Sequence, residues 1–217
     1  MNAPAAMVRP GKRAGSFTAR RSFLSRAGVL GGCLLSLALL GRVADGALPG
    51  MQQAFESDWM EQAHEIGLAL FSYANDNNQT YPDGKSSTEV FQKLLDGGYI
   101  TDPTIFFLPL PGKTKAAGGK LKPENVGFDV TGGADSSSPD GLPLVFMTGY
   151  KVTYAAGGAA VPLATPYPPG IAACYKSNNS KFMRGAGADG SIPNFVPANF
   201  DAGGRTYRQL TPDGSTP

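Results

Sequence analysis

The chain contains few side chains suited to acid–base or metal chemistry, and His64 is its only histidine. A Ser-His-Asp or Cys-His arrangement would need this imidazole as its base. Glu61 and Glu65 flank His64 at positions i−3 and i+1, which supplies too few ligands for a metal site. These residue types therefore argue against a hydrolase whose catalytic site lies away from His64.

Two short segments have part of a ligand-binding motif. Residues 185–190 have the spacing Gly-x-Gly-x-x-Gly, but Ser191-Ile192-Pro193 does not begin the helix that a dinucleotide site requires. Asp76-Asn77-Asn78 begins like a calcium loop and lacks its glycine and distal glutamate. We interpret the first segment as a turn and the second as a helix terminator.

Several aromatic residues in the second half of the chain could form either core packing or a ligand surface. We expect core and sheet-face packing, with a sugar-binding surface as the alternative. These residues are Phe106, Phe107, Tyr150, Tyr154, Tyr167 and Tyr175. The two cysteines, Cys33 and Cys174, stand far apart, and we expect Cys174 to be a buried small apolar residue.

Charge is divided unevenly along the chain, whose formal net charge is +2. Seven basic residues precede the first acidic residue, Asp45: Arg9, Lys12, Arg13, Arg20, Arg21, Arg26 and Arg42. From Ala47 onward, 12 Lys and Arg stand against 16 Asp and Glu, a net charge of −4. The positive charge belongs to the N-terminal region, so we expect no nucleic-acid partner.

The N-terminal region predicts export. Arg20, Arg21, Phe23 and Leu24 lie in a segment similar to the twin-arginine signal, Arg-Arg-x-Phe-Leu. Residues 27–40 are mostly apolar, a length typical of a signal peptide and short for a membrane span. We interpret residues 1–46 as an export signal, cleaved before Ala47 or retained as a short anchor that provides the chain's membrane contact.

One stretch has the apolar spacing of a long helix. Six positions fall at steps of three or four residues, on one helix face: Phe55, Trp59, Ala63, Ile66, Leu70 and Tyr73. Pro49 suits a first turn, and Pro82 forbids continuation. The pattern predicts a helix over residues 49–74, whose apolar face must lie on the rest of the chain.

The remainder is rich in glycine and proline, with 29 and 18 residues in the whole chain, which favours short strands and many turns. A short helix is expected over residues 87–96, capped by Ser86, Ser87 or Thr88 and stopped by Gly97-Gly98. Strands are expected at residues 126–130, 142–147, 150–154, 171–175, 181–184 and 192–196.

We expect residues 142–147 and 150–154 to form a hairpin, and residues 155–169 to form coil. The predicted fold class is α+β, with a long N-terminal helix packed on a small antiparallel sheet. The head would span residues 47–201, followed by a flexible tail at residues 202–217.

The end of the helical stretch resembles a known family. Residues 65–77, Glu-Ile-Gly-Leu-Ala-Leu-Phe-Ser-Tyr-Ala-Asn-Asp-Asn, followed by Tyr81-Pro82, are similar to the start of the head in bacterial type II secretion pseudopilins. The similarity is to the type IV pilin-like branch that carries a His-x9-Asp-Gly motif. Here Asn179 precedes Asp189-Gly190 at that spacing, and Leu108 stands where the family has a cysteine.

The N-terminal region departs from this family. Prepilins carry Gly-Phe-Thr-Leu-x-Glu followed by about 20 apolar residues, and residues 15–19, the nearest match, lack both the glutamate and the apolar span. Assembly into a filament by the usual route does not follow from the resemblance. The resemblance implies a calcium site in related proteins, for which Asp189 and Asp201 are the candidates here. A hairpin turn at Asp189-Gly190 is the simpler interpretation.

We expect a non-enzymatic structural subunit of a type II secretion or type IV pilus-like envelope system. Its partners would be other pseudopilins or envelope secretion proteins and the export machinery, in the periplasm or at the periplasmic face of the inner membrane. No cofactor other than calcium is expected. The alternative is an exported binding module for polysaccharide or protein that has kept the pilin-like fold.

Overall fold

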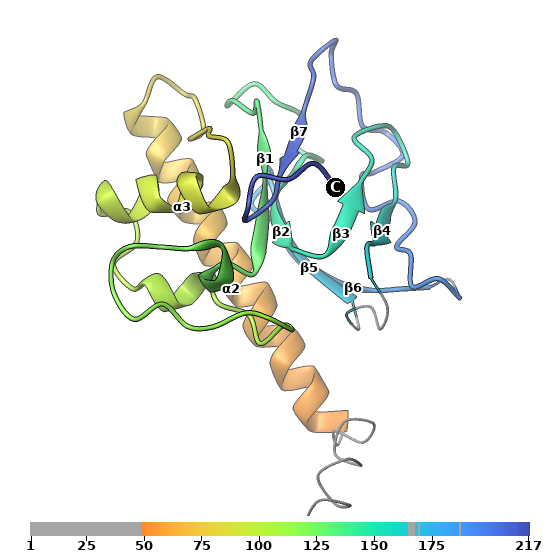
Figure 1. Cartoon of the computed structure of the whole chain (residues 1–217). Helices are drawn as coiled ribbons and strands as arrows, with labels where there is room; N and C mark the ends of the chain where they lie inside the picture. The colour runs from red at the N-terminus through yellow and green to blue at the C-terminus, as the bar shows by residue number, and fades with distance from the viewer. Residues whose placement is uncertain (1–48, 165–167, 169, 187) are drawn as a thin grey trace, which may run out of the picture. The chain divides into compact units, whose positions relative to one another are not determined.

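The longest element is the helix α2 (Pro49–Asp76), which confirms the predicted helix and extends it by two residues at its C-terminal end. Ala63, Ile66 and Leu70 of the predicted apolar face are buried. The first turns of α2 extend beyond the sheet (Figure 1), which leaves the side chain of Phe55 43% exposed. The apolar face is therefore covered along the later turns only.

The computed structural model describes residues 49–217, except 165–167, 169 and 187. The predicted export signal at residues 1–46, with Arg20, Arg21, Phe23 and Leu24, lies outside the described residues.

The end of α2 confirms the predicted terminator. The side-chain amide of Asn77 donates to the carbonyl of Tyr73 at 2.8 Å, a side-chain bond that competes with helix continuation. Asn78 and Gln79 then take positive φ angles of 53° and 64°. The chain leaves the helix within three residues.

Five antiparallel strands form the sheet on which α2 lies, in the order β6-β5-β2-β1-β7 (Figure 1). The strands are β1 (Phe128–Gly132), β2 (Pro143–Met147), β5 (Gly170–Tyr175), β6 (Ser180–Arg184) and β7 (Arg208–Leu210). α2 packs against β5, β6 and β2. The arrangement confirms the predicted fold, a long helix on an antiparallel sheet.

Gly67 lets α2 approach β5 closely. A Cβ atom at this position would lie 2.5 Å from Sγ of Cys174, well inside van der Waals contact. Cys174 is 1% exposed, as predicted for a small apolar residue, and burial raises the pKa of its thiol.

The strands expected at residues 171–175 and 181–184 form a hairpin, β5 and β6. The two strands pair from Gly170 opposite Arg184 to Cys174 opposite Ser180. Asn178 occupies the turn with a φ of 60°, a left-handed conformation that asparagine tolerates better than most residues.

The predicted hairpin of residues 142–147 and 150–154 is wrong. β2 pairs with β1 on one side and β5 on the other, so neither of its edges is open to β3 (Tyr150–Val152). β3 instead pairs with β4 (Ala160–Pro162) in a separate two-stranded sheet. Residues 155–169, predicted as coil, thus supply a strand.

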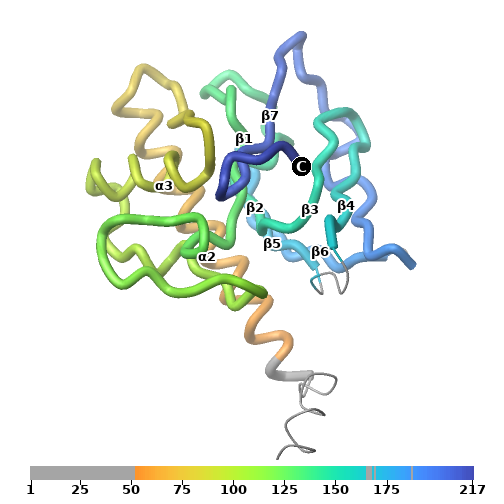
Figure 2. The backbone as a smooth tube through the Cα atoms, in the orientation of Figure 1, coloured from red at the N-terminus to blue at the C-terminus, as the bar shows by residue number. Residues whose placement is uncertain are grey.

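The prediction of a flexible tail at residues 202–217 is also wrong. β7 pairs with β1 and forms one edge of the main sheet (Figure 2). Leu210 is buried, and the backbone N–H of Ser87 donates to the carbonyl of Thr211 at 2.9 Å. Residues 192–196, expected to form a strand, contribute one isolated bridge, between Ile192 and Ala160.

The short helix α3 (Ser87–Asp96) confirms its prediction, with Ser86 as N-cap accepting from the backbone N–H of Glu89 at 3.2 Å. Two 3-10 turns follow, η1 (Pro103–Phe106) and η2 (Pro123–Asn125). Leu108 is fully buried and packs close to Gly127.

Candidate functional site

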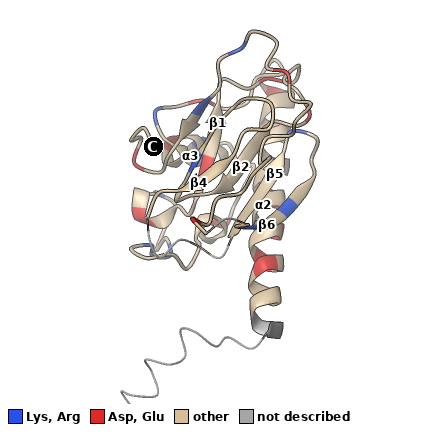
Figure 3. Cartoon of the chain, turned by 90° about the vertical axis from the view of Figure 1, so that its right-hand side faces the viewer, with Lys and Arg blue, Asp and Glu red and all other residues tan. Residues whose placement is uncertain are grey.

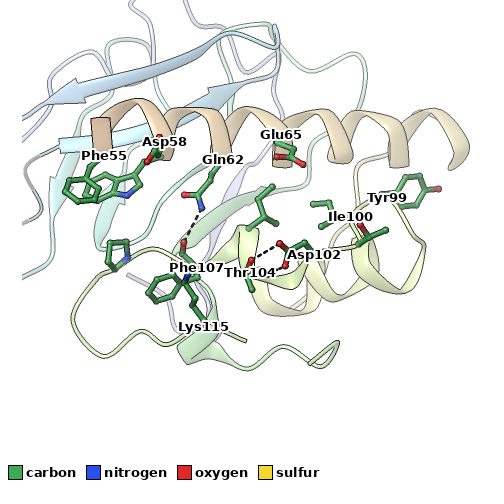
Figure 4. A pocket seen from close by; sticks show the side chains of 14 residues that line it. Phe55, Asp58, Gln62, Glu65, Tyr99, Ile100, Asp102, Thr104, Phe107 and Lys115 are labelled. Atoms are coloured by element: carbon green, nitrogen blue, oxygen red, sulfur yellow. Dashed lines mark hydrogen bonds between the residues drawn. The ribbon is translucent and has the colours of Figure 1, made fainter. Parts of the chain in front are cut away.

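A groove of about 540 Å³ lies between the first half of α2 and the segment that follows α3 (Figure 4). The side chains that α2 contributes are Phe55, Asp58, Trp59, Gln62 and Glu65. The opposite wall includes Tyr99, Asp102, Thr104, Phe107 and Lys115. Aromatic rings and carboxylates thus share one concave surface, which makes the groove a candidate site.

The opposite wall is held in place by contacts behind it. Phe106 stacks on Phe91 of α3, with ring centroids 4.5 Å apart and planes at 15°. The backbone N–H of Gly127 donates to the carbonyl of Phe106 at 2.7 Å. Across the groove, the Gln62 side chain donates to the carbonyl of Phe107 at 3.5 Å (Figure 4). An irregular segment is therefore anchored to α3, to the start of β1 and to α2.

Trp59 is fixed between two other rings. Its ring centroid lies 6.3 Å from that of Phe55 in a stacked arrangement and 6.2 Å from that of Phe182 on β6. Such ring pairs add about 0.5–1.5 kcal/mol beyond the area that they bury. The groove thus presents an aromatic surface whose orientation the sheet sets.

The groove carries more negative than positive charge. Its carboxylates belong to Asp58, Glu65 and Asp102, and among the described residues that line it Lys115 is the one cation. Bonds from the backbone N–H and then the hydroxyl of Thr104 lower the pKa of Asp102, with a smaller contribution from Lys115. Lys115 Nζ also lies 5.8 Å from the ring centroid of Phe107. The negative charge of Asp102 is thus stabilised by Thr104 and Lys115 on its own wall of the groove.

The residues of the predicted Asn-x9-Asp-Gly motif lie in turns. Gly190 has a φ of 71°, and Asp189 accepts from the backbone N–H of Ser191 at 3.0 Å. Asp201 accepts from the backbone N–H of Gly203 at 2.9 Å in a separate turn. Asn179 accepts from the backbone N–H of Tyr175 through its carbonyl, in the β5–β6 turn.

These positions agree with the interpretation of Asp189-Gly190 as a turn. Within the described ranges there is no group of three or more His, Cys, Asp or Glu side chains placed to hold a metal ion. The calcium prediction for Asp189 and Asp201 remains a prediction.

The aromatic residues considered for a sugar surface are mostly internal. Phe106, Tyr150 and Tyr175 are buried, whereas Phe107 is half-buried in the groove. Tyr167 lies outside the described residues. His64 is half-buried on α2. The described aromatic residues of this set therefore do not form one common surface.

Asp129 is a buried acid that the sequence analysis did not single out. It is fully buried on β1 and accepts from Gln209 Nε2 at 2.6 Å. Gln209 also donates to the carbonyl of Tyr150 at 2.6 Å and accepts from the backbone N–H of Val152 at 3.0 Å. The only signal in the sequence was an acid between Phe128 and Val130 in an apolar strand.

Burial raises the pKa of Asp129 to about 7, against the opposing effect of the bond from Gln209. The side chain of Thr148 also lowers the pKa of Asp129. Oδ1 of Asp129 nevertheless makes no hydrogen bond of normal geometry. The carboxyl thus joins β1, β7 and β3 through Gln209 and resists ionisation.

No family model, curated protein or solved structure matches this chain. In the part of the chain that the structure describes, every helix is too short or too polar to cross a lipid bilayer.

Proposed function

We propose that this chain is a non-enzymatic, pseudopilin-like structural subunit of a bacterial type II secretion or type IV pilus-like envelope system. The proposal draws on the resemblance of residues 65–82 to pseudopilin heads and on the twin-arginine-like segment. The fold is consistent with it, since a long helix near the N-terminus packs on an antiparallel sheet.

The observation that supports the proposal best is the surface of α2. Among the described residues, five large apolar side chains are prominently exposed, and three of them lie on this helix: Phe55, Leu68 and Phe71. Leu68 and Phe71 are 41% and 51% exposed and border a depression that also includes Tyr81 and Lys176. Leu68 and Phe71 are three residues apart and share one face of α2, and neighbouring exposed apolar side chains are typical of a surface that meets another protein.

Fractionation of producing cells tests the proposal. We expect the chain in the membrane fraction, cross-linked to envelope filament or secretion components, and the variant Leu68→Ser/Phe71→Ser to lose those cross-links while keeping its fold. Val161→Ser/Leu163→Ser, which replaces two exposed apolar residues near β4, is the matched control and should retain them.

N-terminal sequencing of the same material separates the alternatives. A mature chain that starts at Ala47 and is found entirely in the soluble periplasm, with no cross-linked envelope component, would contradict the structural-subunit proposal. That result would favour an exported binding module.

A further inference from the structure

The α2 wall of the groove combines exposed carboxylates with aromatic rings. Two of its carboxylates, Asp58 and Glu65, have no ion-pair or hydrogen-bond partner within the described part of the chain. Glu56, by contrast, is held by Arg184 at 2.7 and 2.9 Å. Among the described residues Glu61 also has no such partner and does not line the groove, so Asp58 and Glu65 differ from it in lying on the groove wall near the aromatic rings.

The three polar residues on the α2 wall form a line. Asp58, Gln62 and Glu65 follow one another at steps of four and three, so they share one face of the helix and point into the groove (Figure 4). At 1.5 Å per residue, Asp58 and Glu65 are about 10 Å apart along the axis. Figure 3 shows acidic positions along this projecting part of α2.

Aromatic rings lie beside this line. Phe55 and Trp59 are stacked on α2, and Phe107 faces them from the other wall. An arginine side chain can pair with a carboxylate and stack on an aromatic face at the same time, whereas a neutral saccharide would leave the carboxylates unpaired. The charge and the rings therefore favour a cationic ligand.

We propose that the groove beside α2 binds an extended, arginine-containing segment of a partner protein, whose two arginines lie four residues apart and pair with Asp58 and Glu65. In an extended chain, residues i and i+4 point to the same side and are about 13 Å apart, so the long arginine side chains can reach both acids. An apolar or aromatic side chain two residues beyond the arginine at Asp58 packs on Phe55 and Trp59, which lie at that end of the groove (Figure 4). The inference concerns a peptide site and does not depend on assembly of the chain into a filament.

The chain carries its own reporter for this groove, since Trp59 is its single tryptophan. The probe is a synthetic peptide with two arginines four residues apart and a leucine two residues beyond one of them, titrated into the chain purified from producing cells. We expect saturable change in the emission of Trp59 and weaker binding at about 0.5 M salt than at about 0.05 M, because the pairs are partly exposed.

Paired variants assign the contacts. Asp58→Asn/Glu65→Gln should raise the Kd of the peptide roughly tenfold or more. Glu61→Gln is the matched control, since Glu61 lies on the same helix, is exposed and does not line the groove. It should change the Kd by less than about twofold, the factor expected for a distant exposed charge.

Four results would overturn the inference. They are no response of Trp59 up to about 1 mM peptide, equal binding of a peptide with glutamates in place of both arginines, an unchanged Kd for Asp58→Asn/Glu65→Gln, and a response to a neutral oligosaccharide without one to the peptide. Loss of membrane retention alone would contradict the proposed function and leave this binding intact, so the two failures are distinguishable.

Discussion

Asp129 shows how a single side chain can couple the stability of this head to pH. Its carboxyl is buried where Gln209 joins β1, β7 and β3, and burial raises its pKa to about 7. The charged groups that act on it are Lys113, which lowers its pKa, and Asp213, which raises it. The folded state therefore binds a proton that the unfolded chain has already released above a pH of about 4.

The first prediction follows from the sign of this shift. The contribution of Asp129 to stability is fully present below the ordinary aspartate pKa and is lost as the pH rises towards about 7. Asp129→Asn keeps an acceptor for Gln209 and removes the ionisation, so its free energy of unfolding should exceed that of the parent at pH 8 by on the order of 4 kcal/mol at most.

Urea unfolding at pH 5 and pH 8 checks this expectation, with Asp140→Asn as a surface control. Asp140 pairs with Lys176 at 2.9 Å and is 77% exposed, so its replacement should cost less than about 1 kcal/mol at either pH. An Asp129→Asn variant as pH-sensitive as the parent would show that another group governs the profile.

At the scale of elements, the contact between α2 and β5 depends on the absence of a side chain. Gly67 lies mid-helix, where glycine ordinarily costs about 1 kcal/mol relative to alanine. The close approach of Cys174 explains its use, because any Cβ at position 67 would collide with the thiol. The helix and the sheet can therefore pack this closely because residue 67 has no side chain.

A double-mutant cycle tests the match. Gly67→Ala should lower the free energy of unfolding by about 1–3 kcal/mol, since overpacking outweighs the gain in helix propensity. In a Cys174→Ala background the nearest sulfur is gone, and the same change should be close to neutral. Chemical denaturation of the four proteins gives the coupling energy, and additive effects would contradict the close contact.

The elements also show which parts of the candidate site could be predicted. Apolar spacing predicted α2 and its buried residues, and helical geometry then places Asp58 and Glu65 on one face. The opposite wall is irregular, and its position depends on the stacking of Phe91 and Phe106, a contact that local spacing does not encode. For the same reason the groove itself could not be predicted from sequence patterns.

The wrong strand assignments have a related cause. Thr148-Gly149 between two apolar runs is typical of a hairpin turn, but whether β2 pairs with β3 depends on which strands already occupy its edges. The tail expected at residues 202–217 is instead part of the sheet, because Leu210 is buried and β7 pairs with β1, which is far away in the sequence. Tertiary pairing overrides local preference in both cases.

For the whole molecule, β7 closes the sheet beside β1. Leu210 is buried, and Arg208 contacts both carboxylate oxygens of Asp83 at 2.7 Å. Together these contacts attach the C-terminal residues to the sheet and to the segment before α3.

Truncation of Leu210 tests this role. Leu210→Ala should destabilise the head by about 2–4 kcal/mol, because it leaves a cavity beside β1. Val161→Ala, at a 42% exposed position of β4, should cost less than about 0.5 kcal/mol. Thermal unfolding of both variants gives the comparison, and equal effects would mean that β7 contributes little to the global fold.

The distance along the chain between β1 and β7 has a consequence for biogenesis. Asp129 and Gln209 are 80 positions apart. The edge of β1 that pairs with β7 therefore has no partner until the ribosome has added residues 208–210. During that interval the nascent chain presents an unpaired strand, which favours association with other chains. A cell that makes this protein in quantity would therefore gain from a chaperone that covers this edge of β1 until residues 208–210 have been synthesised.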